Sequence, residues 1–158
     1  MPGWDYRASD DPPEIFCFRG PFFSLLRGEK QLPLGTLAFF NLGEAAAPRR
    51  VRREDLELPE GNYLAWDVWH ETLTCWSGEL TASVPAHGST LFSIAVNDGS
   101  VQLLDADMKV DAVTPVADGL QVTFAFAGQV VLHYWDGRAV RRLECRSAGP
   151  GDTCILPG

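Results

Sequence analysis

The sequence predicts an all-β protein, and three observations lead to that prediction. Short apolar runs recur along the chain with alternating, period-two patterning. Turn signals rich in glycine, proline, asparagine and aspartate separate these runs. Apolar stripes at helical spacing are too short to indicate a dominant helix. We therefore expect a two-sheet antiparallel β-sandwich of about ten short strands, with a β-barrel as the alternative.

The first half of the domain contains the clearest strands. Residues 1–13 are polar and end in two prolines, which indicates a linker or lead-in, so we expect a single domain over residues 14–158. The runs "EIFCFRG" and "TLAFFNL" read as strands, and "YLAWDVWHETLTCW" reads as a pair of strands. The arginines of "PRRVRRE", followed at once by acidic residues, indicate an edge strand whose charges are neutralised locally. Only "PFFSLL" and "REDLEL" are candidates for a helical turn.

The second half continues in the same manner. The segment "ELTASVPAHGSTLFSIAV" predicts two strands around a turn at residues 85–88. Three further turns are predicted at Asn97-Asp98-Gly99, Asp118-Gly119 and Asp136-Gly137, which are typical of β-hairpins. Residues 97–158 are therefore expected to add hairpins to a core formed by residues 36–96.

Composition and charge argue against some classes of function. The chain has 158 residues, of which 46% are hydrophobic and 22% are charged, and a chain of this length buries roughly 70% of its unfolded surface. The net charge of -8 opposes binding to nucleic-acid phosphates. No apolar run reaches the ~20 residues of a membrane span, and the N-terminal sequence does not look like a secretory signal. We expect a cytoplasmic protein with neither nucleic acid nor membrane as a partner.

The metal-ligating residue types do not form a recognisable motif. The histidines and cysteines lack ligand spacing, so we expect neither a metal nor another cofactor. Buried free thiols are the preferred interpretation of the cysteines, and a bridge between Cys145 and Cys154 across a short glycine-rich loop is the alternative. The residues concerned are Cys17, Cys75, Cys145, Cys154, His70, His87 and His133.

The tryptophan-rich segment from Tyr63 to His70 is the best candidate for a binding surface. If it is one strand with one buried face, Leu64, Trp66 and Val68 form the more apolar side, and we expect Trp66 in the core. Tyr63, Asp67 and Trp69 then face outward, where an aromatic ring beside a carboxylate suits either a sugar or a protein partner. No catalytic residues are predicted. The candidate contact residues are Trp69, Tyr63, Asp67, His70 and Trp135.

The stretches "LAFFNLGE", "APRRVRREDLELPEGNY", "LAWDVWHETL" and "SVPAHGSTLFSI" occur in this order over residues 36–96. In order and spacing they resemble the C-terminal β-sandwich domain that follows the catalytic (β/α)8 barrel of α-galactosidase-like glycoside hydrolases. The chain departs from that pattern at Leu42, where the family often has an aromatic residue, and at His70-Glu71, where it often has a small polar turn. The resemblance implies a domain without the catalytic carboxylates, because those lie on the barrel.

Three functions remain open. The first is a non-catalytic accessory module that packs against a catalytic barrel through an apolar patch around Trp69. The second is a stand-alone carbohydrate-binding module with Trp69, Tyr63 or Trp135 as a stacking platform. The third, an enzyme on a β scaffold, needs a cleft that brings together groups such as His133, Asp136 and Glu144.

Overall fold

The computed structural model describes residues 4–5, 15–18 and 35–158, and over these residues the protein is all-β, as predicted. Every strand pairing among them is antiparallel. The helical turn predicted in "REDLEL" is a 3-10 turn at Glu54–Leu56. The other candidate, "PFFSLL", lies outside the described residues.

The first half of the chain builds two sheets. The larger has the strand order β1-β2-β3-β8-β5-β6, and β4 pairs with β7 to form the smaller one. The bounds are β1 Trp4–Asp5, β2 Ile15–Phe18, β3 Gly35–Asn41, β4 Ala47–Arg52, β5 Tyr63–Asp67, β6 Thr72–Trp76, β7 Glu79–Val84 and β8 Gly88–Val96. Trp4–Asp5 thus pairs with β2, although residues 1–13 were expected to be a lead-in; the domain boundaries stay predictions.

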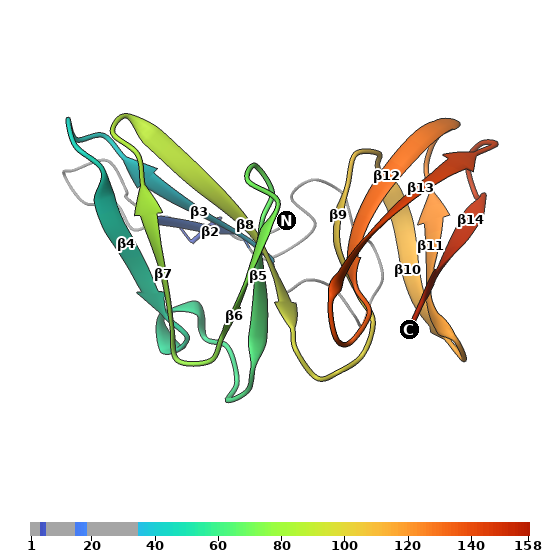
Figure 1. Ribbon diagram of the computed structural model, residues 1–158, viewed down its shortest axis with the longest axis horizontal. Helices are drawn as coiled ribbons and strands as arrows, with labels where there is room; N and C mark the ends of the chain where they lie inside the picture. The colour runs from blue at the N-terminus through green and yellow to red at the C-terminus, as the bar shows by residue number, and fades with distance from the viewer. Residues whose placement is uncertain (1–3, 6–14, 19–34) are drawn as a thin grey trace.

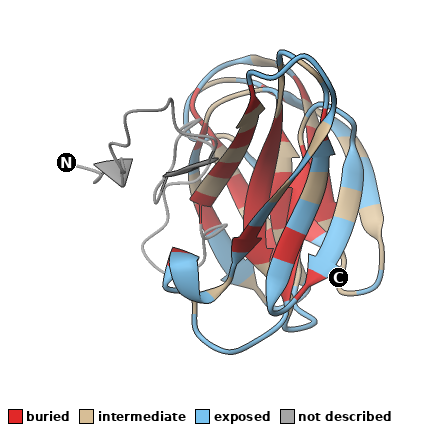
Figure 2. Cartoon of the chain, turned by 90° about the vertical axis from the view of Figure 1, so that its left-hand side faces the viewer, coloured by how far each residue is buried: buried red, intermediate tan, exposed pale blue. Residues whose placement is uncertain are grey.

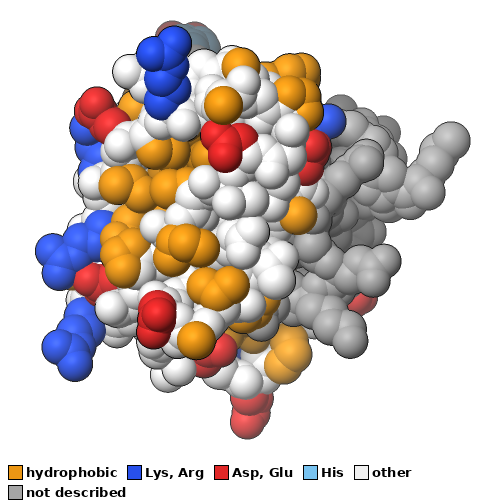
Figure 3. All heavy atoms as spheres, turned by 90° about the vertical axis from the view of Figure 1, so that its right-hand side faces the viewer, with side chains coloured by type: hydrophobic (Ala, Val, Ile, Leu, Met, Phe, Trp, Pro, Cys, Tyr) orange, Lys and Arg blue, Asp and Glu red, His pale blue; other side chains and the backbone are white. Residues whose placement is uncertain are grey.

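The second half builds two three-stranded sheets, in the orders β13-β12-β9 and β10-β11-β14. The bounds are β9 Gln102–Ala106, β10 Val110–Val116, β11 Gly119–Phe124, β12 Gly128–Trp135, β13 Val140–Ser147 and β14 Thr153–Pro157. The outer face of the β10-β11-β14 sheet carries apolar side chains among scattered charged ones (Figure 3), and Ile155 of β14 is an exposed member of that face.

The sheets stack as four layers (Figure 1): β4-β7, the six-stranded sheet, β13-β12-β9, and β10-β11-β14. The β-sandwich class is confirmed, but the described residues hold fourteen strands in four sheets rather than about ten strands in two. A single sandwich has one apolar layer between its sheets, whereas this stack has three. A central strand of this stack, such as β5, is therefore buried on both faces.

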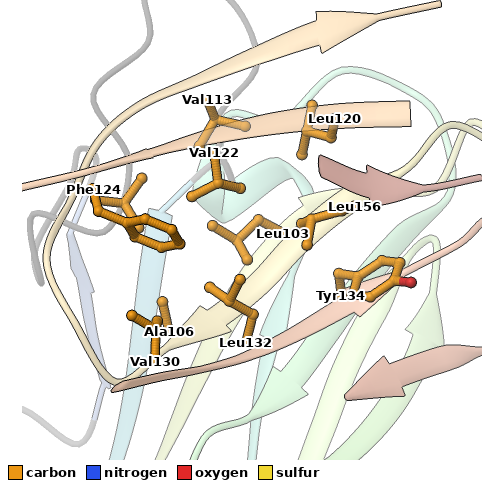
Figure 4. Packing of buried hydrophobic residues seen from close by; sticks show 11 residues of the cluster. Leu103, Ala106, Val113, Leu120, Val122, Phe124, Val130, Leu132, Tyr134 and Leu156 are labelled. Carbon is orange, nitrogen blue, oxygen red and sulfur yellow. The ribbon is translucent and has the colours of Figure 1, made fainter. Parts of the chain in front are cut away.

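Each interface between layers contains its own apolar cluster. Leu37, Phe39, Tyr63 and Trp76 belong to the cluster between β4-β7 and the six-stranded sheet. Figure 2 shows buried residues gathered on the central strands and exposed ones on the loops and outer strands. Between the last two sheets, side chains from both sheets point toward one another (Figure 4). This cluster includes Leu103, Val110, Val113, Val122, Phe124, Leu132 and Leu156.

The middle interface joins the two halves of the chain. Leu64 and Trp66 of β5 pack with Ala95 of β8 and Leu104 of β9, and Trp135 of β12 lies against them. Because β5 faces this cluster on one side and the first cluster on the other, all five of its residues are buried. This double burial decides where the candidate site residues lie.

The predicted turns are found, with one difference. Asp118 and Asp136 lie in the hairpin turns β10–β11 and β12–β13. The connection at Asn97 is not a hairpin, because β8 and β9 belong to different sheets and the turn carries the chain from one layer to the next. The expected local neutralisation is also present: Arg52 pairs with Asp55, and Arg53 pairs with Glu54.

Candidate functional site

The candidate site is the turn Val68–Glu71, which joins β5 to β6. Oδ1 of Asp67 accepts the backbone N–H groups of Trp69 and His70, each at 3.0 Å, and its Oδ2 lies 2.8 Å from His70 Nδ1. Aspartate commonly begins turns by accepting nearby backbone N–H groups in this way. The N–H of Val68 donates to the Leu91 carbonyl of the neighbouring strand at 3.0 Å. The turn is thus fixed by side chain and sheet together.

Three residues of this turn, Trp69, His70 and Glu71, are exposed to solvent. Trp69 is 56% exposed, and the side chain of His70 is 59% exposed. The expectations that Trp69 faces outward and that Trp66 belongs to the core, where it is 3% exposed, are both confirmed. An exposed indole therefore stands beside an imidazole on a constrained turn.

The expectation that Tyr63 and Asp67 face outward was wrong. Tyr63 is only 3% exposed and Asp67 only 7%. The Tyr63 ring centroid lies 5.3 Å from that of Trp76, and its hydroxyl donates to the Pro59 carbonyl at 2.7 Å. The physical reason is the layer stack: the face assumed to meet solvent is covered by β4-β7. Tyr63 is thereby part of the core, and Asp67 supports the turn from beneath.

Trp135 does not form an open stacking platform either. It is half-buried and packs against the cluster of Leu64, Trp66, Ala95 and Leu104 in the middle interface. Its indole nitrogen is buried and has no hydrogen-bond partner among the described residues. Of the five predicted contact residues, the structure brings together Trp69 and His70 at the surface with Asp67 below them, and places Tyr63 and Trp135 in the interior.

A second polar cluster lies at the middle interface and was not predicted. His133 of β12 is 7% exposed and its ring centroid lies 5.1 Å from that of Trp66. Its Nδ1 lies 3.7 Å from Asp105 Oδ2, and its Nε2 lies 4.0 Å from Glu71 Oε1 in the candidate turn. Burial raises the pKa of Asp105, although the nearby His133 and Trp66 side chains favour its charged form.

The enzyme hypothesis required His133, Asp136 and Glu144 to share a cleft, and the structure gives the two carboxylates other partners. Asp136 accepts the backbone N–H groups of Arg138 and Ala139, and these bonds together with the Arg141 side chain lower its pKa to about 2. Glu144 pairs with Arg142. Asp136 thus organises a hairpin turn, and His133 instead faces Asp105 and Glu71.

The described residues contain no group of three or more histidine, cysteine or acidic side chains placed to hold a metal ion. Within the same residues, no helix has the length and apolar character to cross a membrane. The cysteines among them are free thiols, as preferred, but they are not buried: Cys75 is exposed, and Cys145 and Cys154 are half-buried.

No family model matches the chain, and no curated protein matches it. Among solved structures, alpha-galactosidase I from Mortierella vinacea is similar at 20% sequence identity and a TM-score of 0.39. The match covers 54% of this chain and 21% of that enzyme. The chain thus spans about a fifth of the enzyme's length, and a likeness at this TM-score identifies neither a domain nor an activity.

Proposed function

We propose that the chain is a non-catalytic carbohydrate-binding module whose ligand stacks on Trp69. The observation that carries this proposal is the constrained turn of Asp67, Trp69 and His70, in which the indole ring is 56% exposed. Because the backbone that carries Trp69 is already fixed, little backbone freedom is lost when a sugar ring packs on its indole. The neighbouring imidazole supplies a polar group at the edge of that platform.

The immediate surroundings of Trp69 favour a small ligand over a large protein interface. Stable protein interfaces bury about 800 Å² on each partner and have an apolar centre. Tyr63, which was expected to widen the apolar patch, is buried, and the residues that follow Trp69 are the exposed polar His70 and Glu71. A single indole with polar neighbours supports stacking on one sugar ring.

Titration calorimetry with soluble galactomannan and with soluble β-glucan tests the proposal. We expect saturable binding to at least one of them, weakened about 5- to 30-fold in Trp69→Ala, since loss of a central aromatic contact costs about 1–2 kcal/mol. Trp69→Phe should retain part of the affinity because a smaller ring can still stack. Absence of heat with both polysaccharides would refute the proposal.

Phe126→Ala is the matched control. Phe126 has the same exposed fraction as Trp69, 56%, but lies in a different loop. If Trp69→Ala and Phe126→Ala weakened binding equally, the effect would come from general surface hydrophobicity and not from the β5–β6 turn.

A protein partner is the second candidate, and one observation favours it. Leu42 and Phe126, which are 61% and 56% exposed, lie in the β3–β4 and β11–β12 connections, at the same upper end of the molecule as the β5–β6 turn (Figure 1). An accessory module that supports a catalytic barrel could use this end. In that case Leu42→Ser and Phe126→Ser would weaken association with the barrel while leaving polysaccharide binding unchanged.

A further inference from the structure

We propose that Cys145 and Cys154 form a reversible disulfide that joins the two sheets of the C-terminal half. The two residues lie on β13 and β14, which are edge strands of different sheets. In Figure 1 the two strands come together near the connection that joins them, and some of their Cα atoms approach within 8 Å of one another. This modification site is independent of the proposed sugar platform.

Both thiols point toward the same interior. Cys145 and Cys154 each pack against the cluster that includes Leu132 and Leu156, so both side chains are directed toward the space between the two sheets. The Cys154 thiol is also near enough to Cys145 to contribute, after burial, to the raised pKa of the Cys145 thiol. A disulfide requires Cβ atoms that face each other over a short distance, and two strands that approach each other beside one shared apolar cluster favour such a pair.

The connection between the strands holds the pair in place. Asp152 accepts the N–H of Ala148 at 2.7 Å through Oδ2 and that of Thr153 at 2.9 Å through Oδ1. The N–H of Asp152 in turn donates to the Gly149 carbonyl at 3.1 Å. The connection that leads from β13 to β14 is therefore fixed by hydrogen bonds on both sides of Asp152.

The oxidant in this proposal is a low-molecular-weight disulfide such as oxidised glutathione. The thiolate of Cys154 attacks it, releases one glutathione thiolate and forms a mixed disulfide. The sulfur of Cys145 then loses its proton to solvent, attacks the Cys154 sulfur and releases the second glutathione. Two protein thiols are oxidised and one glutathione disulfide is reduced to two thiols, so atoms and electrons balance.

The environment of Cys145 makes this exchange slow near neutral pH. Burial, the Cys154 thiol and the nearby carboxylates of Asp152 and Asp107 raise the pKa of Cys145 to about 12. The thiolate is the reactive species, and well below the pKa its fraction increases tenfold per pH unit. Closure of the bond should therefore accelerate by about tenfold per pH unit through mildly alkaline pH when the second step limits the rate.

Peptide mapping of the full chain tests the proposal. Cleavage after Arg142 and Arg146 separates residues 143–146 from residues 147–158. After treatment with oxidised glutathione, we expect a linked pair of these two peptides that has lost two hydrogen atoms and separates on reduction. The oxidised protein should also have a Tm on the order of 5–10 °C higher, since the bond closes a short loop of the unfolded chain.

Cys75→Ser is the matched control, because Cys75 is an exposed cysteine on β6. It should leave the linked peptides unchanged, whereas Cys145→Ser and Cys154→Ser should each abolish them. Recovery of the two peptides unlinked, each carrying its own glutathione, would overturn the proposal, as would a link from either cysteine to Cys75 or Cys17.

Discussion

Removal of the Asp67 carboxylate should loosen the candidate turn and destabilise the protein. In Asp67→Ala, the N–H groups of Trp69 and His70 lose their acceptor, and His70 Nδ1 loses its partner. Hydrogen bonds to a charged group each contribute about 1.5–3 kcal/mol. These bonds are only part-buried, so water replaces them in part, and we expect a total loss of about 2–4 kcal/mol in the free energy of unfolding.

Urea unfolding followed by tryptophan fluorescence measures this loss. In thermal unfolding, a domain of about 150 residues loses about 2–4 °C of Tm for each kcal/mol lost in the free energy of unfolding. The Tm of Asp67→Ala should therefore fall by roughly 5–15 °C. Asp67→Asn is the matched control, because its side-chain oxygen can still accept both N–H groups, and it should lose about half as much. An Asp67→Ala protein within about 0.5 kcal/mol of the unaltered chain would show that the turn does not depend on this carboxylate.

Three further substitutions test other parts of the protein. Gly119 has φ of +146°, and a Cβ built there would lie 2.0 Å from the Leu156 carbonyl oxygen; Gly119→Ala should therefore cost about 2–5 kcal/mol in urea unfolding. Gly99→Ala, where φ is +85° and no atom lies within 4 Å of the Cβ, should cost about 1–2 kcal/mol. Burial raises the pKa of Asp105 above its unfolded value, so its ionisation opposes folding as pH rises through the folded pKa. The free energy of unfolding of Asp105→Asn, relative to that of the unaltered chain, should thus be higher at neutral pH than at acidic pH. The same difference in free energy at acidic and at neutral pH would contradict this.

The all-β class and most turns could be predicted from the sequence because they depend on local features. Period-two patterning and residues such as Asp118 and Asp136 act within a few positions of the chain. The number of layers depends instead on which sheet packs on which, and local pattern does not contain that information. The continuous apolar run "YLAW" in β5 was nevertheless a usable signal, since strands buried on both faces lack alternation.

The cluster around His133 could not be predicted for the same reason. Glu71 and His133 are far apart in the sequence and lie on different sheets or their connections, so only the packing of β5-β6 on β12 brings them within 4.0 Å. Asp105 and His133, by contrast, are direct partners in the pairing of β9 with β12. The contact between Asp105 and His133 could therefore be predicted from the strand order alone.

The exposure of Trp69 was predicted correctly, but the structure gives a different reason for it. Alternation along a continuous strand would have placed Trp69 on the same face as Tyr63, and that face is buried. Trp69 is exposed because β5 ends at Asp67, whose carboxylate turns the chain out of the sheet before Trp69 is reached. Exposure of the indole is therefore a consequence of the turn and not of the sheet, and a binding role for Trp69 should depend on Asp67 as well. Asp67→Ala should weaken polysaccharide binding at a temperature where the protein remains folded, whereas an unchanged affinity would mean that the indole is presented without the help of the turn.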